Sequence, residues 1–176
     1  MKVSKIMRFA RRGMGVFAAG AFALTLVGCG GSPSVKGSVP AEQEAPQKEQ
    51  KTTDLAAGTA VDMGNGMTVS VDSIEPSVAG ASNTYVKISV TYKNEGDDTV
   101  SFNPFDWKGE DANGAQEDHT YFAGPDFSSD DAELNSGNLA AGGTKSGTLY
   151  FKEGTTKILF TGNIFSKDVQ ASWTVA

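Results

Sequence analysis

The sequence predicts an all-β protein whose folded part is an immunoglobulin-like antiparallel two-sheet sandwich. Apolar and polar residues alternate in short segments, turn residues separate these segments every ~8–12 residues, and no segment after residue 54 keeps a helical period. About 120 residues with roughly eight short strands favour two packed sheets. The 176-residue chain has one Cys, so packing alone must hold the sheets together.

The chain begins with a segment that is typical of a bacterial signal peptide. Residues 1–28 contain Lys and Arg but no acidic residue, and residues 13–28 carry no charge at all. As a helix the uncharged run would reach about 24 Å, which is short of the ~30 Å hydrocarbon core of a membrane. We therefore expect residues 1–28 to direct export and to be removed.

The last residues of this run resemble the bacterial lipobox: Leu26, Val27, Gly28 and Cys29. The resemblance implies cleavage before Cys29 and acylation of that cysteine. Each buried CH₂ contributes about 0.8 kcal/mol, so two or three acyl chains anchor a protein firmly. The predicted location is the extracytoplasmic face of a bacterial cell membrane. Ordinary cleavage at residues 21–23 is the alternative, and it would leave Cys29 as a free thiol.

A polar tether is expected between the anchor and the domain. Residues 30–54 contain three Pro, no aromatic residue and many small polar residues. Such a segment cannot bury enough apolar surface to offset the entropy that it loses on ordering. The predicted organisation is a signal peptide at 1–28, the acylated cysteine with a disordered tether at 29–54, and the sandwich at 55–176.

The strands of the domain are predicted from period-two patterns. Residues 85–92 place apolar side chains on one face and polar side chains on the other. Further short strands are predicted at residues 67–71, 100–102, 148–151, 157–160 and 169–175. Asn113 and Gly114 predict a hairpin with a type I′ turn, and residues 94–96 predict another tight reversal.

A spread pattern in the middle of the domain carries a family resemblance. It includes residues 85–94 followed by Gly96 and Asp97, then residues 102–107, and later residues 142–143 and 149–151. This pattern resembles a domain-of-unknown-function family of Gram-positive lipoproteins, which is sometimes mislabelled telomeric repeat-binding factor. The family is related to secreted mycobacterial antigens with an immunoglobulin-like fold. The resemblance implies an extracytoplasmic β-sandwich and carries over no catalytic residue.

The charge balance excludes one class of partner. After residue 28, 10 Lys and Arg stand against 21 Asp and Glu, which gives a formal charge of −11. Such a body repels nucleic-acid phosphates and anionic lipid headgroups, so we expect no nucleic-acid binding and attribute membrane attachment to the lipid anchor. No nucleophile motif is present, and we expect neither enzyme activity nor a cofactor.

Acidic and aromatic residues crowd the segment from 102 to 133. Hard oxygen ligands in adjacent loops can hold calcium, although the spacing matches no EF-hand, and a solvated acidic face is the alternative. The weak calcium candidates are Asp106, Glu110, Asp111 and Asp118. Exposed aromatic side chains could instead contact a partner, or they could plug the open end of the sandwich. The candidate partner contacts are Phe105, Trp107, Tyr121 and Phe127.

The leading hypothesis is a monomeric, lipid-anchored surface lipoprotein without catalytic activity. Its immunoglobulin-like module would bind another envelope or host protein, or a glycan. The alternative is a small-ligand or metal-binding lipoprotein that serves a transporter or sensor. That alternative predicts a concave polar pocket, with Met63, Met67 or His119 nearby if the metal is copper.

Overall fold

The structure is a computed structural model that describes the backbone of Ser34–Val35 and all of residues 51–176. The predicted signal peptide, the lipobox and Cys29 lie outside the described residues, as does most of the predicted tether. Within the described part, no helix has the length and apolar character needed to cross a membrane.

The described chain contains eleven strands and one short 3-10 helix, η1, at Pro104–Asp106. The strands, in chain order, are β1 (Ser34–Val35), β2 (Ala60–Asp62), β3 (Met67–Ala79), β4 (Thr84–Asn94), β5 (Val100–Phe102), β6 (Trp107–Asp111), β7 (Gln116–Asp118), β8 (Gly137–Leu139), β9 (Thr144–Lys152), β10 (Thr155–Phe160) and β11 (Ala171–Thr174).

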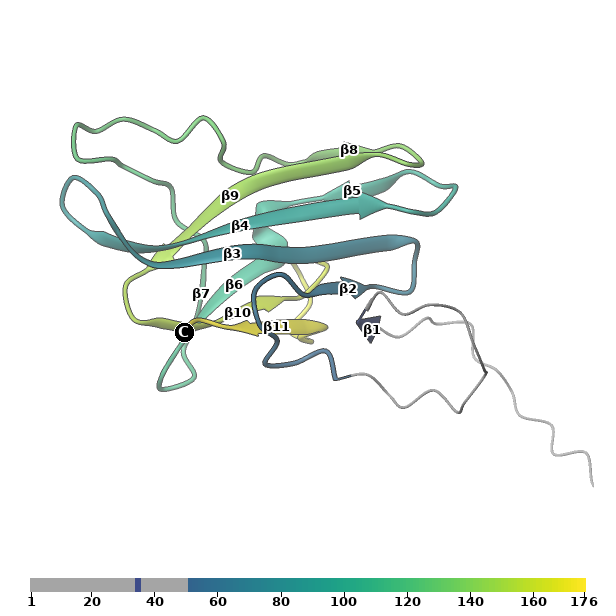
Figure 1. The fold of residues 1–176 in the computed structure, drawn as a ribbon, viewed down its shortest axis with the longest axis horizontal. Coiled ribbons are helices and arrows are strands. Elements are labelled where there is room, and N and C mark those ends of the chain that lie inside the picture. The colour runs from purple at the N-terminus through teal and green to yellow at the C-terminus, as the bar shows by residue number, and fades with distance from the viewer. Residues whose placement is uncertain (1–33, 36–50) are drawn as a thin grey trace, which may run out of the picture.

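These strands form two main layers (Figure 1). One sheet has the order β1-β2-β3-β4-β9, the other has the order β11-β10-β6-β7, and β5 pairs with β8 in a separate two-stranded ribbon. All of these strand pairs are antiparallel. The predicted all-β, immunoglobulin-like antiparallel sandwich is confirmed.

The core lies between the two layers and is rich in aromatic rings. Strand β4 buries the predicted apolar face, since Val86, Ile88, Val90 and Tyr92 are at most 1% exposed. From the other sheet, the Trp107 ring packs edge to face on Tyr92 at 6.1 Å, and it lies 5.6 Å from the Trp173 ring of its own sheet. Large fully buried aromatic side chains from both sheets therefore meet in the core.

Strand β3 is longer than its sequence pattern predicts. It continues from Val71 through Pro76 to Ala79, and its register against β4 shifts between Val71 and Ser73 and again between Glu75 and Val78. A proline cannot donate to a sheet ladder and is tolerated at such a bulge. The bulge thus allows β3 to continue through a residue that usually ends a strand.

The turn at residues 112–114 differs from the predicted one. The Gly114 N–H donates to the Asp111 carbonyl over 3.1 Å, and Gly114 has a φ of +82°. Asn113 does not have a positive φ, so the predicted type I′ turn is wrong. The Asp111 carboxylate accepts the Asn113 and Ala115 N–H groups over 2.8 and 2.9 Å. The hairpin is therefore a type I turn followed by glycine in the left-handed region.

The folded domain begins before the predicted boundary at residue 55. The Ser172 N–H donates to the Thr52 carbonyl, and the Asp54 carboxylate pairs with Lys157 over 3.1 Å. Ser34–Val35 also pairs with β2. The prediction of a disordered tether is therefore wrong for these positions, because free backbone groups at both sheet edges accept additional strand pairing.

The β7–β8 connection, green in Figure 1, pairs with the edge of β9 through backbone hydrogen bonds. The Phe122 ring stacks on Tyr150 at 4.5 Å, and the Asp130 carboxylate accepts the Tyr150 hydroxyl over 2.6 Å. Asp130 also accepts the Thr148 hydroxyl and pairs with Lys87. Burial of Asp130 tends to raise its pKa. The hydrogen bonds from Tyr150, Thr148 and the Ala132 N–H, together with the nearby Lys87 charge, outweigh burial and lower the pKa to about 2. The loop is thus held to the sheet by an ionised carboxylate.

Candidate functional site

The three-residue helix η1 lies between β5 and β6 and separates two features of the surface. Asn103 caps it, because its side-chain oxygen accepts the Phe105 N–H over 3.0 Å. Pro104 follows at the first helical position, where its missing N–H needs no partner. The turn leaves Phe105 41% exposed and buries Asp106 to 6%. Neighbouring residues therefore serve two different environments.

The first feature is an exposed aromatic cluster, which consists of Phe105, His119 and Tyr121. The Phe105 and His119 rings meet edge to face at 4.6 Å, and His119 and Tyr121 do so at 5.6 Å. Tyr121 is 69% exposed. The aromatic cluster therefore presents apolar ring surface to solvent, of the kind that protein interfaces use.

His119 is the polar member of the aromatic cluster. Burial lowers its pKa, against an opposing effect of the Asp118 charge, so the imidazole is neutral at pH 7. Its Nδ1 atom is buried and has no hydrogen-bond partner among the described residues. The neutral ring therefore adds aromatic surface beside Phe105 rather than a positive charge.

The remaining predicted partner contacts separate into one buried and one distant residue. Trp107 is fully buried at the start of β6, and its indole N–H donates to the Tyr92 hydroxyl over 2.6 Å. The prediction that Trp107 contacts a partner is therefore wrong, because this side chain belongs to the core. Phe127 is 79% exposed on the β7–β8 connection but shares no ring contact with the aromatic cluster among the described residues. Partner contact by Phe105, Tyr121 and Phe127 stays a prediction.

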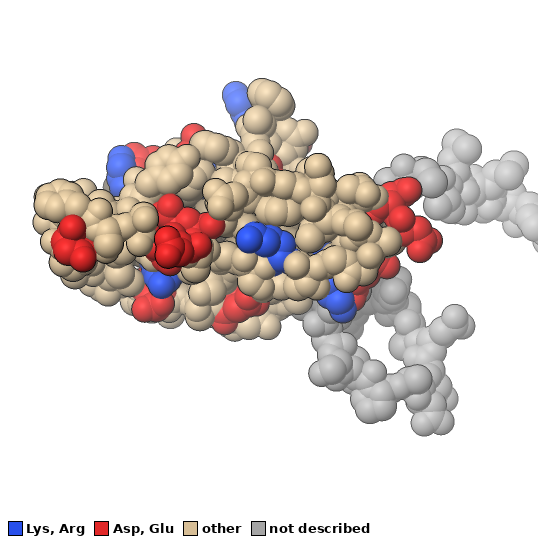
Figure 2. Space-filling model, turned by 90° about the horizontal axis from the view of Figure 1, so that it is seen from above, with Lys and Arg blue, Asp and Glu red and all other residues tan. Residues whose placement is uncertain are grey.

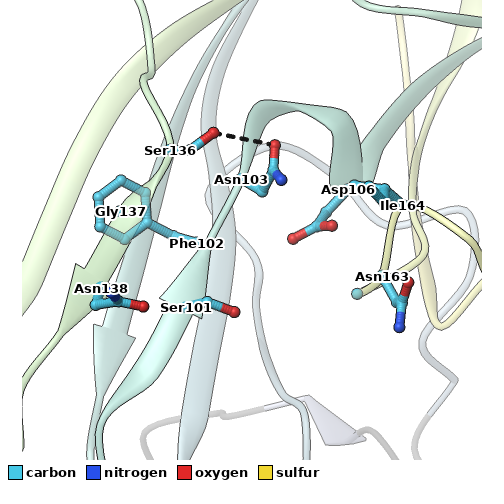
Figure 3. Close-up of a pocket in the computed structure, with 10 residues that line it drawn as sticks. Ser101, Phe102, Asn103, Asp106, Ser136, Gly137, Asn138, Asn163 and Ile164 are labelled. Carbon is cyan, nitrogen blue, oxygen red and sulfur yellow. Dashed lines mark hydrogen bonds between the residues drawn. The ribbon is translucent and has the colours of Figure 1, made fainter.

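The second feature is an open pocket of about 500 Å³ that Asp106 of η1 lines together with residues from other elements, and we call it the Asp106 pocket. The Asp106 carboxylate points into it, between the strand that carries Ser101 and the loop that carries Asn163 (Figure 3). Asn138 and Ser136, from the start of the β8 region, line the same space. The wall is thus polar, and Asp106 is the charged residue in it.

The Asp106 carboxylate lacks a donor. Among the described residues, no N–H or O–H group donates to its side chain, and the nearby Thr161 groups bind its backbone carbonyl instead. Burial raises the pKa of this carboxyl from 3.8 to about 6. Asp106 is therefore mostly ionised at pH 7 despite its burial, at a cost in free energy.

The structure does not bring the four calcium candidates together. The Asp111 carboxylate caps its own hairpin, the Asp118 carboxylate pairs with Lys108 over 2.6 Å, and Glu110 accepts the Gln116 amide. Asp106 faces its own pocket. Among the described residues, no three His, Cys, Asp or Glu side chains gather as a metal site would require. The calcium hypothesis for this set is therefore wrong, because each carboxylate has a separate environment.

The acidic residues are also dispersed on the surface. On the face shown in Figure 2, they stand in several separate groups within a mostly uncharged surface.

The copper hypothesis fails for its two methionines, because Met63 and Met67 are only 5% and 6% exposed within the hydrophobic core. These side chains fill the core next to the β2–β3 turn and cannot reach a ligand in solvent.

Comparison with known proteins identifies the family. The model of a domain of unknown function, DUF4352, matches residues 55–170. The chain belongs to this family. The match confirms the resemblance that the pattern around residues 85–107 indicates. DUF4352 is described without an activity, and no curated protein matches the chain.

Three solved structures with a similar fold come from Bacillus and Mycobacterium. The YjhA protein of Bacillus subtilis is 16% identical, with a TM-score of 0.44 over 58% of this chain and 78% of that one. A secreted protein of Mycobacterium tuberculosis is 12% identical, with a TM-score of 0.47 over 67% of this chain and 86% of that one. A candidate lipoprotein of Bacillus subtilis, YcdA, is 12% identical, with a TM-score of 0.49 over 72% of this DUF4352 chain and 39% of the other.

Proposed function

We propose that this DUF4352 chain is a lipid-anchored, extracytoplasmic lipoprotein whose β-sandwich binds an envelope or host protein without catalysis. The leader and the four residues that end at Cys29 support the anchor. The aromatic cluster is the observation that carries the binding role, because it leaves Phe105 and Tyr121 41% and 69% exposed side by side with His119.

The geometry of the aromatic cluster suits a protein contact. Aromatic rings bury a large area at a small entropic cost, and they are enriched in the residues that dominate binding energy. Lys108 and Asp118 form an ion pair near the cluster, which provides a polar rim. The formal charge of −11 after residue 28 favours a partner with a basic surface.

The binding role is tested by photo-crosslinking in cells that express the full chain. A photoreactive phenylalanine analogue replaces Tyr121, and the same analogue at Phe165 is the control, because Phe165 is 88% exposed on the β10–β11 loop. A discrete crosslinked species at position 121 that disappears with Phe105→Ala supports the proposal. Equal crosslinking at both positions, or none at position 121, contradicts it, and a glycan adduct would change the class of partner.

The anchor is tested separately. Cells that express the chain are labelled with a palmitate analogue, and the Cys29→Ser variant is compared with the parent protein. Loss of label in Cys29→Ser supports acylation at the predicted position. Unchanged labelling would remove the anchor from the proposal and leave the binding role to be decided by the crosslinking experiment.

A further inference from the structure

We propose that the Asp106 pocket is a binding site for a small primary amine, whose ammonium group pairs with the Asp106 carboxylate. This inference requires neither the lipid anchor nor the aromatic cluster, because no residue of the cluster lines the pocket. The proposed amine-binding site can therefore be tested independently of the proposed function.

The first reason is the uncompensated charge. Asp106 is 6% exposed, and no described residue donates a hydrogen bond to its carboxylate. The lining contains no Lys, Arg or His. The carboxylate oxygens have no donor among the described residues and face the open pocket, so a cation that enters the pocket gains a charge-assisted hydrogen bond. The protein does not supply this cation from its described residues, so we assign it to a ligand.

The second reason is the character of the neighbouring groups. Ser101 and Asn138 stand opposite each other on the β5–β8 ribbon, and neither side chain has a hydrogen-bond partner among the described residues. An ammonium group has three N–H donors, and a second polar group on the same ligand can use a hydroxyl or an amide. The pocket thus offers one charged acceptor and two free polar side chains.

The third reason is size. The volume of about 500 Å³ lies in the range of small-molecule sites and greatly exceeds that of a single ion. A divalent metal usually takes several carboxylates or other oxygen ligands, whereas Asp106 is the only acidic residue in this lining. Ile164 adds an apolar wall that is 43% exposed at the rim. An organic ammonium with a short apolar body fits these features better than a metal ion.

The inference is tested by isothermal titration calorimetry on the purified full chain. The probe is 5-amino-1-pentanol, and the matched control compound is 1,5-pentanediol, which has the same length but no ammonium group. The variants are Asp106→Asn, which removes the pocket charge, and Asp131→Asn, which removes a charge from the exposed β7–β8 connection. We expect the parent protein and Asp131→Asn to bind the amine equally, and Asp106→Asn to bind it at least about tenfold more weakly.

A gain-of-binding variant guards against a fault in the folding of Asp106→Asn. Asn163→Asp adds a second carboxylate to the lining and keeps the side-chain oxygen that accepts the Phe165 N–H. It should tighten amine binding several-fold. The inference is overturned if the parent protein shows no heat of binding at about 10 mM amine, if Asp106→Asn binds as tightly as the parent, or if 1,5-pentanediol binds as well as the amine.

Discussion

Replacement of Asp106 by Asn should stabilise the protein at neutral pH. The carboxyl pKa is 3.8 ordinarily and about 6 in the fold, where burial raises it. Each pKa unit corresponds to about 1.36 kcal/mol, so the ionised carboxylate costs at most about 3 kcal/mol when the pH is well above 6. An amide has nearly the same shape and carries no charge. We therefore expect the free energy of unfolding to rise by about 1–3 kcal/mol, since burial of the amide retains some cost.

The pH dependence has a definite sign. Between the two pKa values the folded state holds a proton that the unfolded state has released, so the contribution of Asp106 to stability falls as the pH rises from about 4 through about 6. The Tyr92 hydroxyl lies in the same field, but burial and then the Asp106 charge raise its pKa further, so it stays neutral. The difference between Asp106→Asn and the parent protein should therefore be small at about pH 4 and largest above pH ~7.

The measurement is urea unfolding followed by tryptophan fluorescence. Trp107 and Trp173 are fully buried, so their emission reports the loss of the core. The two proteins share all other titrating groups, so the difference between them at each pH isolates Asp106. A variant that is less stable than the parent at neutral pH, or a difference that is the same at both pH values, would refute the reasoning.

Three further predictions concern the framework around the site. Asp130→Ala should lower the free energy of unfolding by about 2–3 kcal/mol and increase hydrogen exchange in residues 119–135, because it removes hydrogen bonds to a charged group. In the parent protein this stabilisation is present above pH 3.8 and is lost as the pH falls through about 2. Unchanged exchange in Asp130→Ala would contradict this role. Tyr92→Phe should cost about 1–3 kcal/mol in urea unfolding by leaving the buried Trp107 indole N–H without its acceptor, so a neutral effect would count against that hydrogen bond. Gly66→Ala should lower the melting temperature more than Gly114→Ala does, because both have a φ of +82° but only at Gly66 would the new Cβ lie 2.8 Å from the Gly96 Cα, so equal losses would argue against this close approach.

The sequence predicts the strands whose inward residues are all apolar. It misses strands in which an inward position is not a hydrophobic residue, because the alternation of apolar and polar residues is then broken. Strand β4 alternates without interruption, and its buried face is the predicted one. In β6, Trp107 and Gly109 are buried while Lys108 lies between them. A Cβ at Gly109 would lie 2.9 Å from the Phe151 ring, so this inward position favours glycine and adds no hydrophobic signal. The sequence pattern therefore predicts no strand at Trp107, which explains the wrong partner prediction for this residue.

The two surface features differ in how far a sequence can reveal them. Phe105 and Tyr121 stand out as aromatic residues near turns, and the structure adds only the contact of both rings with His119. The Asp106 pocket combines Asp106 with Asn138 and Asn163 from distant parts of the chain. No sequence spacing links these residues, because only the folded arrangement of the two sheets brings them around the same pocket. The absence of a donor to Asp106 is likewise a property of the folded chain.

The position of both features depends on one chain of hydrogen bonds from the core to η1. The Trp107 indole donates to the Tyr92 hydroxyl, which donates to the Asn103 carbonyl over 3.2 Å. The Asn103 side chain then accepts the Phe105 N–H, and the Asn103 carbonyl also accepts the Asp106 N–H over 3.1 Å. A fully buried ring pair therefore fixes the turn that exposes Phe105 and buries Asp106, so both can act as preformed binding groups.

This connection determines how the two binding proposals can be separated. A change at Asn103 or Tyr92 would move the turn itself and would alter protein binding and amine binding together. Truncation of Phe105 removes a ring that is 41% exposed and contacts His119 but does not line the pocket, and Asp106→Asn changes only a charge inside the pocket. If the two sites are independent, Phe105→Ala should abolish crosslinking and leave amine binding intact, while Asp106→Asn should do the reverse. Loss of both activities in either variant would mean that η1 forms a single binding site.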